Sequence, residues 1–301
     1  MNRMFCATPV YCFGEILWDI LPDGPQPGGA PLNVAYHLSK LKVPTGLISR
    51  IGKDPEGKQL EDLMDNWGIE KHLLQSDPAH ATGRVLAKIT AEDEVDYEIK
   101  FPVAWDFIEA NTNAVEKVKG SDYFIYGSLA ARNAPSRNAL FELLDHAKFK
   151  VFDINLRPPF FTRDLLEILL GKADLLKMNK SELEIVQGML EGNFKNEVEQ
   201  ISFIKEKFNI QEIIVTKGEH GASYYTRDEV YHRGGVTTKV CDTIGSGDSF
   251  LAAFIAHHFL KEPADIILKK AVAMGSFISG KMGGCPPYQL SEYMDIIKKI
   301  S

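Results

Sequence analysis

Asp248 stands directly after the small-residue loop Gly245-Ser246-Gly247, where a segment with helical spacing (249–260) begins. A helix N-terminus offers unpaired N–H donors and a partial positive charge, and glycines let an anion come close to them. The loop therefore predicts a cradle for an oxyanion or a phosphate group. A site for phosphate binding alone would avoid a carboxylate, because like charges repel. A general base must stand where a hydroxyl nucleophile meets phosphorus, which favours that role for Asp248.

A simpler interpretation makes Asp248 only the N-terminal cap of its helix, a position that Asp often occupies. Other polar stretches weigh against this reading. PGGAPLN places Gly28, Gly29 and Asn33 at the start of the first predicted helix. Glycines there permit close backbone approach, and the Asn amide can bind neighbouring hydroxyl groups. The alternative is a Gly-Gly turn with Pro31 in the first helical turn.

Two more polar groups follow predicted strands. Asp19 ends the first strand (10–21), and a carboxylate at the carboxyl end of a strand in an α/β sheet lies where ligands usually bind. Asn155 and Arg157 follow a later strand in NLRPPFF, where two prolines restrict the loop. Arg157 is suited to bind an oxyanion or a phosphate group. An ordinary turn residue at Asp19 and a surface side chain at Arg157 are the alternatives.

The last two polar stretches also follow strands. LKMNKSE leads into a helix, with Asn179 and Glu182 three residues apart. Glu182 is either the acid of a capping box, with Ser181 nearby, or a group that holds a hydrated magnesium ion. VTKGEHGA carries a hydroxyl and two glycines that suit nucleotide contacts, namely Thr216, Gly218 and Gly221.

Strand-like and helical segments alternate over most of the chain. The predicted strands are 10–21, 45–52, 122–127, 150–155, 174–179 and 212–218. The predicted helices are 31–42, 56–68, 135–147, 162–173, 180–190, 196–208, 249–260, 264–281 and 290–300. Alternating strands and helices predict a mostly parallel sheet covered by helices on both faces. The polar stretches then share one rim of that sheet, at the carboxyl ends of its strands.

One region departs from this alternation. The segments 84–90 and 95–101 alternate apolar and polar residues around a short acidic turn, which is typical of a β-hairpin. A small antiparallel flap over a parallel sheet often closes on a ligand, and equally often only decorates an edge. Since no internal repeat or low-complexity linker divides the chain, we expect one domain with a lid.

Composition narrows the class of protein. The chain has 301 residues and a net charge of −7, from 34 basic and 41 acidic residues, which argues against nucleic acid or an anionic membrane as a partner. Its apolar runs are far shorter than the roughly 18 residues that span a bilayer. Glu15 and Asp19 interrupt the apolar N-terminal stretch, so a secretory signal is not expected. Four scattered cysteines predict reduced thiols in a cytoplasmic protein without a zinc site.

Taken together, these stretches resemble a known family. GGAPLN and DTIGSGD resemble the two signatures of the ribokinase, or phosphofructokinase-B-type, sugar kinases, and NLRPP, the N-x-x-E at 179–182 and TKGEHGA also match. The resemblance covers nearly the whole chain in the right order. GEILWDILPDG, YGSLAARNAPSR and FDINLRPPFF look most like fructokinases. Ser246 replaces the usual Ala of the second signature, which an anion hole built from backbone tolerates.

The resemblance implies a ribokinase-like three-layer α/β fold, with a mostly parallel central sheet and a small β-sheet lid. It implies one kinase domain over 1–301, with the lid formed by about 15–30 and about 82–106. The activity implied is transfer of the γ-phosphate of ATP to a sugar hydroxyl. ATP and Mg²⁺ are the implied cofactors, with K⁺ as an optional third. A sugar is the implied partner, and the lid offers a surface through which two copies could form a homodimer.

The resemblance also assigns roles to residues. Asp248 would be the base, beside an anion hole of backbone amides from Gly245, Ser246 and Gly247. Sugar-binding positions would be Asp19, Gly28, Gly29, Asn33, Asn155 and Arg157, with Tyr97 and Phe101 from the lid. Nucleotide and magnesium positions would be Asn179, Glu182, Thr216, Gly218 and Gly221. A monovalent cation would be held by Asp242 and the carbonyls of Ile244 and Gly283.

Two other classes of protein compete with this reading. A dehydrogenase would need GxGxxG after the first strand, whereas Gly14 is followed by Glu15. A non-catalytic sugar sensor on the same fold would be favoured by loss of the base or of the loop glycines, and both are present. Among kinases, 2-keto-3-deoxygluconate, ribose and nucleosides compete with fructose as the substrate.

Overall fold

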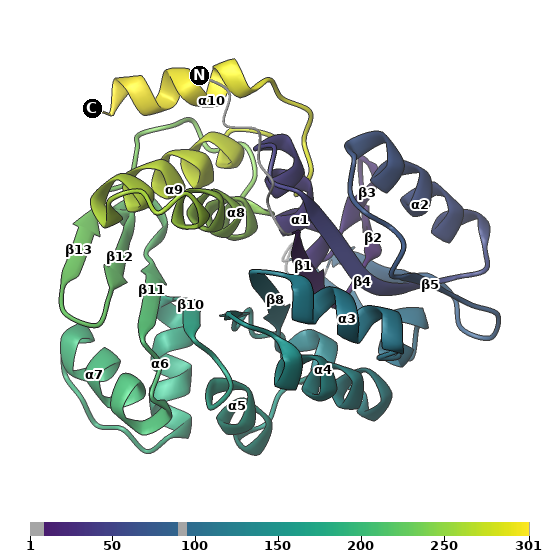
Figure 1. The fold of residues 1–301 in the computed structure, drawn as a ribbon. Coiled ribbons are helices and arrows are strands. Elements are labelled where there is room, and N and C mark those ends of the chain that lie inside the picture. The colour runs from purple at the N-terminus through teal and green to yellow at the C-terminus, as the bar shows by residue number, and fades with distance from the viewer. Residues whose placement is uncertain (1–8, 90–94, 301) are drawn as a thin grey trace.

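The carboxyl ends of parallel strands meet along one edge of a large sheet (Figure 1). The computed structural model describes residues 9–89 and 95–300. Within these residues the sheet has nine strands in the order β13-β12-β11-β10-β9-β8-β1-β4-β5. They are β1 (Val10–Phe13), β4 (Thr45–Gly52), β5 (Leu74–Asp77), β8 (Tyr123–Gly127), β9 (Lys150–Asp153), β10 (Leu175–Asn179), β11 (Glu212–Thr216), β12 (Ala222–Tyr225) and β13 (Val230–Arg233).

The sheet is parallel from β5 to β11, and β12 and β13 add an antiparallel edge. Strand β1 lies between β4 and β8, so the chain extends the sheet from β1 first to one side and later to the other. Ligands of open α/β sheets bind outside the carboxyl ends of the strands at such a switch point. The predicted class, a mostly parallel sheet flanked by helices, is confirmed.

Helices pack on both faces of this sheet. In the described part of the chain they are α1 (Ala30–Lys40), α2 (Pro55–Trp67), α3 (Thr112–Gly120), α4 (Ala134–His146), α5 (Arg163–Leu170), α6 (Lys180–Met189), α7 (Glu197–Phe208), α8 (Ser246–Phe259), α9 (Ala264–Ser279) and α10 (Leu290–Lys299), with short 3₁₀ turns at η1 (Ala104–Phe107), η2 (Leu129–Ala131) and η3 (Gly218–His220). Figure 1 shows α8 and α9 on the side of the sheet opposite to α4 and α5.

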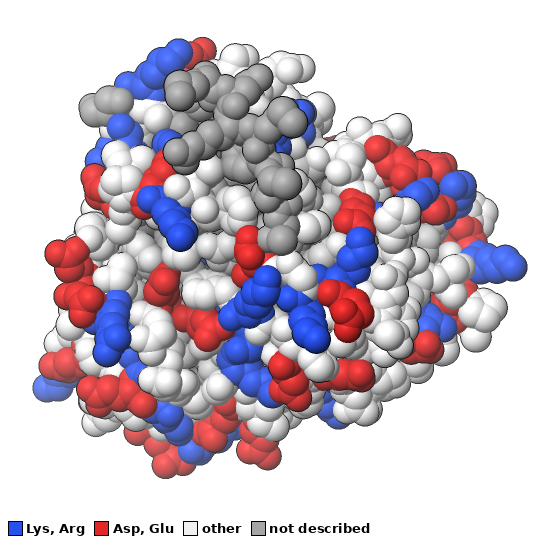
Figure 2. Space-filling view, in the orientation of Figure 1, with Lys and Arg blue, Asp and Glu red and all other residues white. Residues whose placement is uncertain are grey.

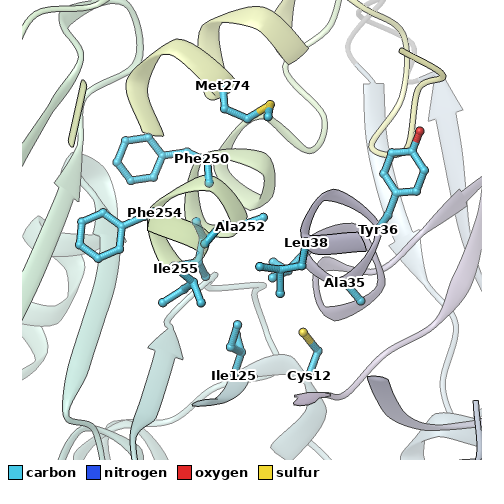
Figure 3. Close-up of a cluster of buried hydrophobic side chains, with 14 of the residues drawn as sticks. Cys12, Ala35, Tyr36, Leu38, Ile125, Phe250, Ala252, Phe254, Ile255 and Met274 are labelled. Carbon is cyan, nitrogen blue, oxygen red and sulfur yellow. The ribbon is translucent and has the colours of Figure 1, made fainter. Parts of the chain in front are cut away.

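Two apolar clusters fill the spaces between sheet and helices. Val10 and Cys12 of β1 pack in one cluster with α1, α8 and α9, while Tyr11 and Phe13 pack in the other with α3 to α7. Successive strand residues thus point to opposite faces, and both faces are buried. This explains why the central strands are continuous apolar runs in the sequence. Figure 3 shows α8 and α1 directing apolar side chains such as Ile255 and Leu38 toward Ile125 and Cys12.

A second, four-stranded sheet stands beside the first. Its order is β3-β2-β6-β7, from β2 (Leu17–Leu21), β3 (Gly24–Gly28), β6 (Gly83–Ile89) and β7 (Val95–Ile99). β6 and β7 pair antiparallel, as the hairpin prediction required, and β2 pairs parallel with β6. The predicted flap is therefore larger than a hairpin, because the chain after β1 adds two strands to it.

The prediction of one strand over 10–21 was wrong. The segment forms β1 in the large sheet and β2 in the small one, with a break between them at Gly14. Gly14 has φ 140°, a conformation that a side chain would disfavour, and a β-carbon there would lie 2.9 Å from Pro31 Cγ. Asp19 consequently lies inside β2 of the small sheet and not at the carboxyl end of a central strand.

Other elements were missed for physical reasons. β3 has the sequence GPQPG, which is typical of a turn, but it is an edge strand, where proline is tolerated. β5, β12 and β13 are short, and α3 buries only Ala114 and Val118, so its apolar periodicity is weak. The helix predicted over 249–260 begins three residues earlier, at Ser246.

Charged side chains of both signs are interspersed over the face shown in Figure 2. Cys12, Cys241 and Cys285 are free thiols, and Cys6 lies outside the described residues. In the described part of the chain, no helix combines the length and the apolar character that crossing a membrane requires.

The packing of α8 generates a stability prediction. Phe254 is fully buried, and its ring centroid lies 4.8 Å from that of Tyr224. Phe254→Ala should lower the free energy of unfolding by about 3–5 kcal/mol, because the truncation leaves a cavity. Leu260→Ala, at a position 44% exposed just after the same helix, should cost less than about 0.5 kcal/mol. Urea unfolding measures both, and similar losses for the two variants would contradict the packing described.

Candidate active site

The first turn of α8 presents backbone donors at the carboxyl edge of the large sheet. Gly245 is the N-cap residue, and Ser246, Gly247 and Asp248 are the first three helical residues. The Ser246 amide donates to Thr243 O at 3.3 Å, and within the described residues no acceptor is found for the amides of Gly247 and Asp248. Two unpaired N–H groups and the positive end of the helix dipole can together accept an anion.

Asp248 lies beside these donors and does not cap the helix. No side chain caps α8, so the simpler interpretation of Asp248 as an N-cap is wrong. Its Oδ2 accepts a hydrogen bond from Asn33 Nδ2 at 2.8 Å. Burial and the neighbouring Asp153 carboxylate raise the pKa of Asp248 to about 6, against the opposing effects of Lys177, Asn33 and Arg157. A carboxylate of this pKa is ionised at neutral pH and accepts a proton more readily than an ordinary Asp.

The loop 283–286 holds Asn33 in place. Cys285 Sγ donates to Asn33 Oδ1 at 3.2 Å, which leaves the amide nitrogen of Asn33 facing Asp248. A β-carbon on Gly284 would lie 2.5 Å from Asn33 Nδ2, and one on Gly245 would lie 2.5 Å from Gly284 Cα. The loop therefore fits between α1 and α8 only with glycine at both positions. Sequence reasoning missed Gly284 and Cys285.

Asp19 belongs to the same group although it comes from the small sheet. A β-carbon on Gly28 would lie 2.0 Å from Asp19 Oδ2, so the carboxylate occupies the space over that glycine. Burial raises the pKa of Asp19 to about 6, with further increases from Asp248 and Asp242 and an opposing decrease from Arg157. Gly29 is the N-cap residue of α1. The strand predicted for Asp19 was wrong, but the side chain does lie near Asp248.

Asp242 links the other two residues predicted for a monovalent cation, Ile244 and Gly283. Its Oδ1 accepts from the Ile244 amide and its Oδ2 from the Gly283 amide, both at 3.0 Å. The side chain thus links the loop before α8 to the loop after α9. The three residues predicted for the cation are therefore neighbours, while the role of their oxygens as ligands stays a prediction.

Arg157 and Asn155 follow β9. Asn155 has φ 38°, in the left-handed region that Asn tolerates better than most residues. Arg157 is exposed, and its Nη1 donates to Leu156 O at 3.0 Å. Against the effect of burial, its charge lowers the pKa of Asp19 and of Asp248. Arg157 is therefore a solvent-exposed cation close to the carboxylates of Asp19 and Asp248.

Glu182 forms a capping box, as one of the two interpretations predicted. Its Oε2 accepts from the Asn179 amide at 2.8 Å, and the Glu182 amide donates to Asn179 Oδ1 at 2.9 Å. The cap is Asn179 and not Ser181. Oε1 accepts from the Leu156 amide at 3.0 Å. Asn179 and Thr216 are register partners at the ends of β10 and β11, so they lie side by side.

For the remaining predicted positions, the described residues show no hydrogen bond or ion pair with Asp248 or Asp19. Gly218 begins η3 and Gly221 is the C-cap residue that follows it, between β11 and β12. Phe101 is 54% exposed, and its ring lies 5.0 Å from the Arg132 guanidinium. The side chain of Tyr97 lies outside the described residues. Over residues 9–89 and 95–300, no group of three or more His, Cys, Asp or Glu side chains is arranged to hold a metal ion directly.

Three further charged residues were not singled out from the sequence. Asp153 and Lys177 form a buried ion pair, with Lys177 Nζ 2.9 Å from Asp153 Oδ1 and 3.0 Å from Oδ2. Glu15 is buried two residues after the end of β1, and burial raises its pKa to about 7. Charges that interrupt an apolar strand, as in KVFD and LLKMN, are the signal that would have identified the first two.

Comparisons with known proteins show which family the chain belongs to. The model of the pfkB family of carbohydrate kinases matches residues 24–290. Fructokinase of Escherichia coli is 28% identical over 264 residues, which cover 83% of this chain and 84% of that relative. Two solved structures share the fold. Fructokinase with bound ATP from Xylella fastidiosa has a TM-score of 0.84 and 22% identity, over 97% of this chain and 98% of that one.

The second solved structure is a double mutant of fructokinase from Vibrio cholerae O395 with fructose, ADP and a potassium ion. It has a TM-score of 0.81 and 23% identity, and the match covers 96% of this chain and 98% of that one. Because the family model spans most of the sequence and the fold is that of these kinases, the chain belongs to the pfkB family of carbohydrate kinases and is a sugar kinase.

Proposed function

We propose that this sugar kinase is a fructokinase, which transfers the γ-phosphoryl group of ATP to a hydroxyl of fructose. The observation that carries the proposal is the position of Asp248, held by Asn33 at 2.8 Å beside the unpaired amides of α8. A proton acceptor and a set of N–H donors that can bind an anion then lie together at one point of the site. The relatives named fructokinase support the choice of sugar.

The residues of the chain account for each part of the reaction. The sugar oxygen forms a bond to the γ-phosphorus as the bond from that phosphorus to the bridging oxygen breaks, and ADP leaves with the electron pair. Asp248 accepts the hydroxyl proton. The amides of residues 245–248 stabilise the charge on the transferring group, above all those of Gly247 and Asp248, for which the described residues supply no acceptor. Exclusion of water by the surrounding loops strengthens these interactions.

Glu182 fits a magnesium role through water. Each of its oxygens accepts one backbone N–H, and a carboxylate oxygen can accept a second hydrogen bond, so a metal-bound water has an acceptor there. Mg²⁺, when bound with ATP, neutralises phosphate charge. Asn179 assists from the same helix start. Thr216, Gly218 and Gly221 would contact the nucleotide, and Asp242 with the Ile244 and Gly283 carbonyls would hold K⁺.

The charge of the sugar site favours a neutral sugar. Glu15, Asp19 and Asp248 all have raised pKa values, first because of burial and then through their repulsion by other carboxylates. Arg157 is the cation that opposes them on the sugar side. A carboxylate or phosphate on the substrate would add negative charge to this group, whereas hydroxyl groups can donate to it. This distinguishes fructose from 2-keto-3-deoxygluconate.

The small sheet acts as a lid in this proposal. Residues of about 15–30 carry Asp19, Gly28 and Gly29, and residues of about 82–106 carry Tyr97 and Phe101, so closure brings them onto the sugar with Asn33 and Asn155. The outer face of the sheet offers the surface for a homodimer. A ribose or 2-keto-3-deoxygluconate kinase and a non-catalytic sugar sensor are the competing outcomes of the experiments below.

Removal of the base tests the assignment of Asp248. Asp248→Asn should lower kcat by about 10²–10⁴-fold while ATP and fructose bind nearly as before, because only the proton acceptor is lost. A coupled assay of ADP release gives kcat, and calorimetry gives binding. The control is Asp145→Asn. Asp145 is an exposed carboxylate on α4 that pairs with Lys172, and its substitution should change neither kcat nor the binding of ATP and fructose. An Asp248→Asn enzyme with most of its activity would refute the role as base.

The pH dependence of kcat tests the same group independently. A base works when ionised, so kcat should rise with pH through about 6 and level off above it, following the pKa of Asp248. Asn33→Ala removes a hydrogen bond that lowers this pKa, so its acid limb should lie at higher pH than that of the wild type. Initial rates from pH 4.5 to 8 measure the shift, and an acid limb that moves to lower pH would contradict the assignment.

A panel of substrates tests the sugar. With ATP, kcat/KM for fructose should exceed that for 2-keto-3-deoxygluconate and for fructose 6-phosphate by about 10²-fold, since like charges brought together cost several kcal/mol. Ribose and a nucleoside complete the panel. A preference for either charged substrate would overturn the charge argument, and binding of fructose without turnover would favour the sensor.

A further inference from the structure

The ion pair of Lys177 and Asp153 lies at the centre of the site, although the reaction described above does not use it. Lys177 on β10 and Asp153 on β9 are register partners in the large sheet, and their side chains are 8% and 4% exposed. Lys177 Nζ lies 2.9 and 3.0 Å from the two oxygens of Asp153. This ion pair is thus buried among apolar strands at the carboxyl edge of the sheet.

The ammonium of Lys177 faces the first turn of α8. A β-carbon on Gly247 would lie 3.1 Å from Lys177 Nζ, so the ammonium occupies the space beside the backbone of the anion hole. Burial acts to lower the pKa of Lys177, but Asp153, Glu182 and Asp248 raise it above its usual range, which keeps the side chain charged. An ammonium has three donors, and in the described residues Asp153 supplies the acceptors found for it.

A role in stability alone does not explain this arrangement well. Burying an ion pair costs several kcal/mol of hydration, and apolar residues of similar size often stabilise a core as much. A structural link between β9 and β10 also has no need to lie against the helix turn that carries the base. The ammonium stands beside the backbone of the first turn of α8, where a third cationic group can act on the transferring phosphoryl group in addition to Arg157 and a bound Mg²⁺.

We propose that Lys177 is a further catalytic residue, which donates a hydrogen bond to an oxygen of the transferring phosphoryl group, and that Asp153 is the positioning residue that holds it there. The inference rests on the proposed function. During transfer, phosphorus gains a bond to the sugar oxygen and loses its bond to the bridging oxygen of ADP, whose electron pair stays with ADP. The hydroxyl proton passes to Asp248, and Lys177 keeps its protons throughout.

A neutral pair distinguishes catalysis from structure. Lys177→Met combined with Asp153→Asn removes both charges with little change in volume, so the double variant should fold with a melting temperature close to that of the wild type. Its kcat should nevertheless fall by about 10²–10³-fold, as for other preorganised donors to a transition state. Lys172→Met, at a surface lysine 2.7 Å from Asp145, is the matched control and should retain the wild-type kcat. A double variant with kcat within about threefold of the wild type would overturn the proposal.

Binding of a transition-state mimic supplies a second readout that does not depend on turnover. Aluminium fluoride with ADP and fructose mimics the transferring group, and calorimetry should show that it tightens ADP binding to the wild type. The double variant should bind ADP within about threefold of the wild type but lose most of the tightening, about 30-fold or more. Tightening that survives in the double variant would refute contact between Lys177 and the transferring group.

The pH profiles of kcat provide a third test, because the single variants Lys177→Met and Asp153→Asn should shift the acid limb in opposite directions. The groups that change the pKa of Asp248 are Asp153, Lys177, Asn33 and Arg157. Glu15, Asp19 and Cys285 lie nearby. Removing the charge of Lys177 should move the acid limb of kcat to higher pH, and Asp153→Asn should move it to lower pH. Shifts in the same direction would contradict the arrangement. Activity lost in Asp248→Asn but kept in the double variant refutes only this inference, whereas a wild type without transfer to any sugar refutes the proposed function.

Discussion

The burial of one carboxylate at the start of a helix is the constraint on which the site depends. Asp248 leaves water and also faces Asp153, and both effects raise its pKa. Groups from separate elements oppose this rise: Asn33 from α1, Lys177 from β10 and Arg157 from the loop after β9. The result is a pKa of about 6, low enough for ionisation at neutral pH and high enough for the carboxylate to accept a proton. The positions of α1, α8 and the central strands are therefore linked through a single side chain.

Close packing of loops makes that balance possible. Gly245 and Gly284 touch where the loop after α9 crosses the start of α8, and a β-carbon at either position would collide with its neighbours. The loop is also held to α1, since His37 Nε2 lies 3.0 Å from Gly284 O and Tyr36 Oη donates to Pro286 O at 2.5 Å. Burial lowers the pKa of His37 to about 3, so this contact is made by a neutral ring. Asn33 directs its amide nitrogen toward Asp248 because Gly284 packs closely against it and Cys285 donates to its oxygen.

The sequence predicts the elements of this fold better than the contacts between them. Parallel strands such as β4 and β11 are apolar runs bounded by turn residues, and they were predicted within a residue or two. β3 was missed because its prolines are typical of a turn, and β2 was joined to β1 in one predicted strand because no local signal shows that β1 ends before Gly14. Lys177 and Asp153 are 24 residues apart and meet only through strand pairing, so spacing along the chain does not reveal them. Cys285 was missed because a single thiol carries no periodic signal.

The carboxylates of the site come from separate elements, and in the proposed function this connects the lid to the charge of the site. Asp19 stands on β2, and Asp248, at the start of α8, raises its pKa in addition to the effect of burial. Any movement of β2 away from α8 would reduce both effects, so the proton affinity of Asp19 depends on the position of the lid. By linkage, a group that donates a stronger hydrogen bond to Asp19 in the closed position than in the open one favours closure. A neutral sugar supplies such donors without adding charge, and in the proposed function it would therefore promote the closure that excludes water from the transfer.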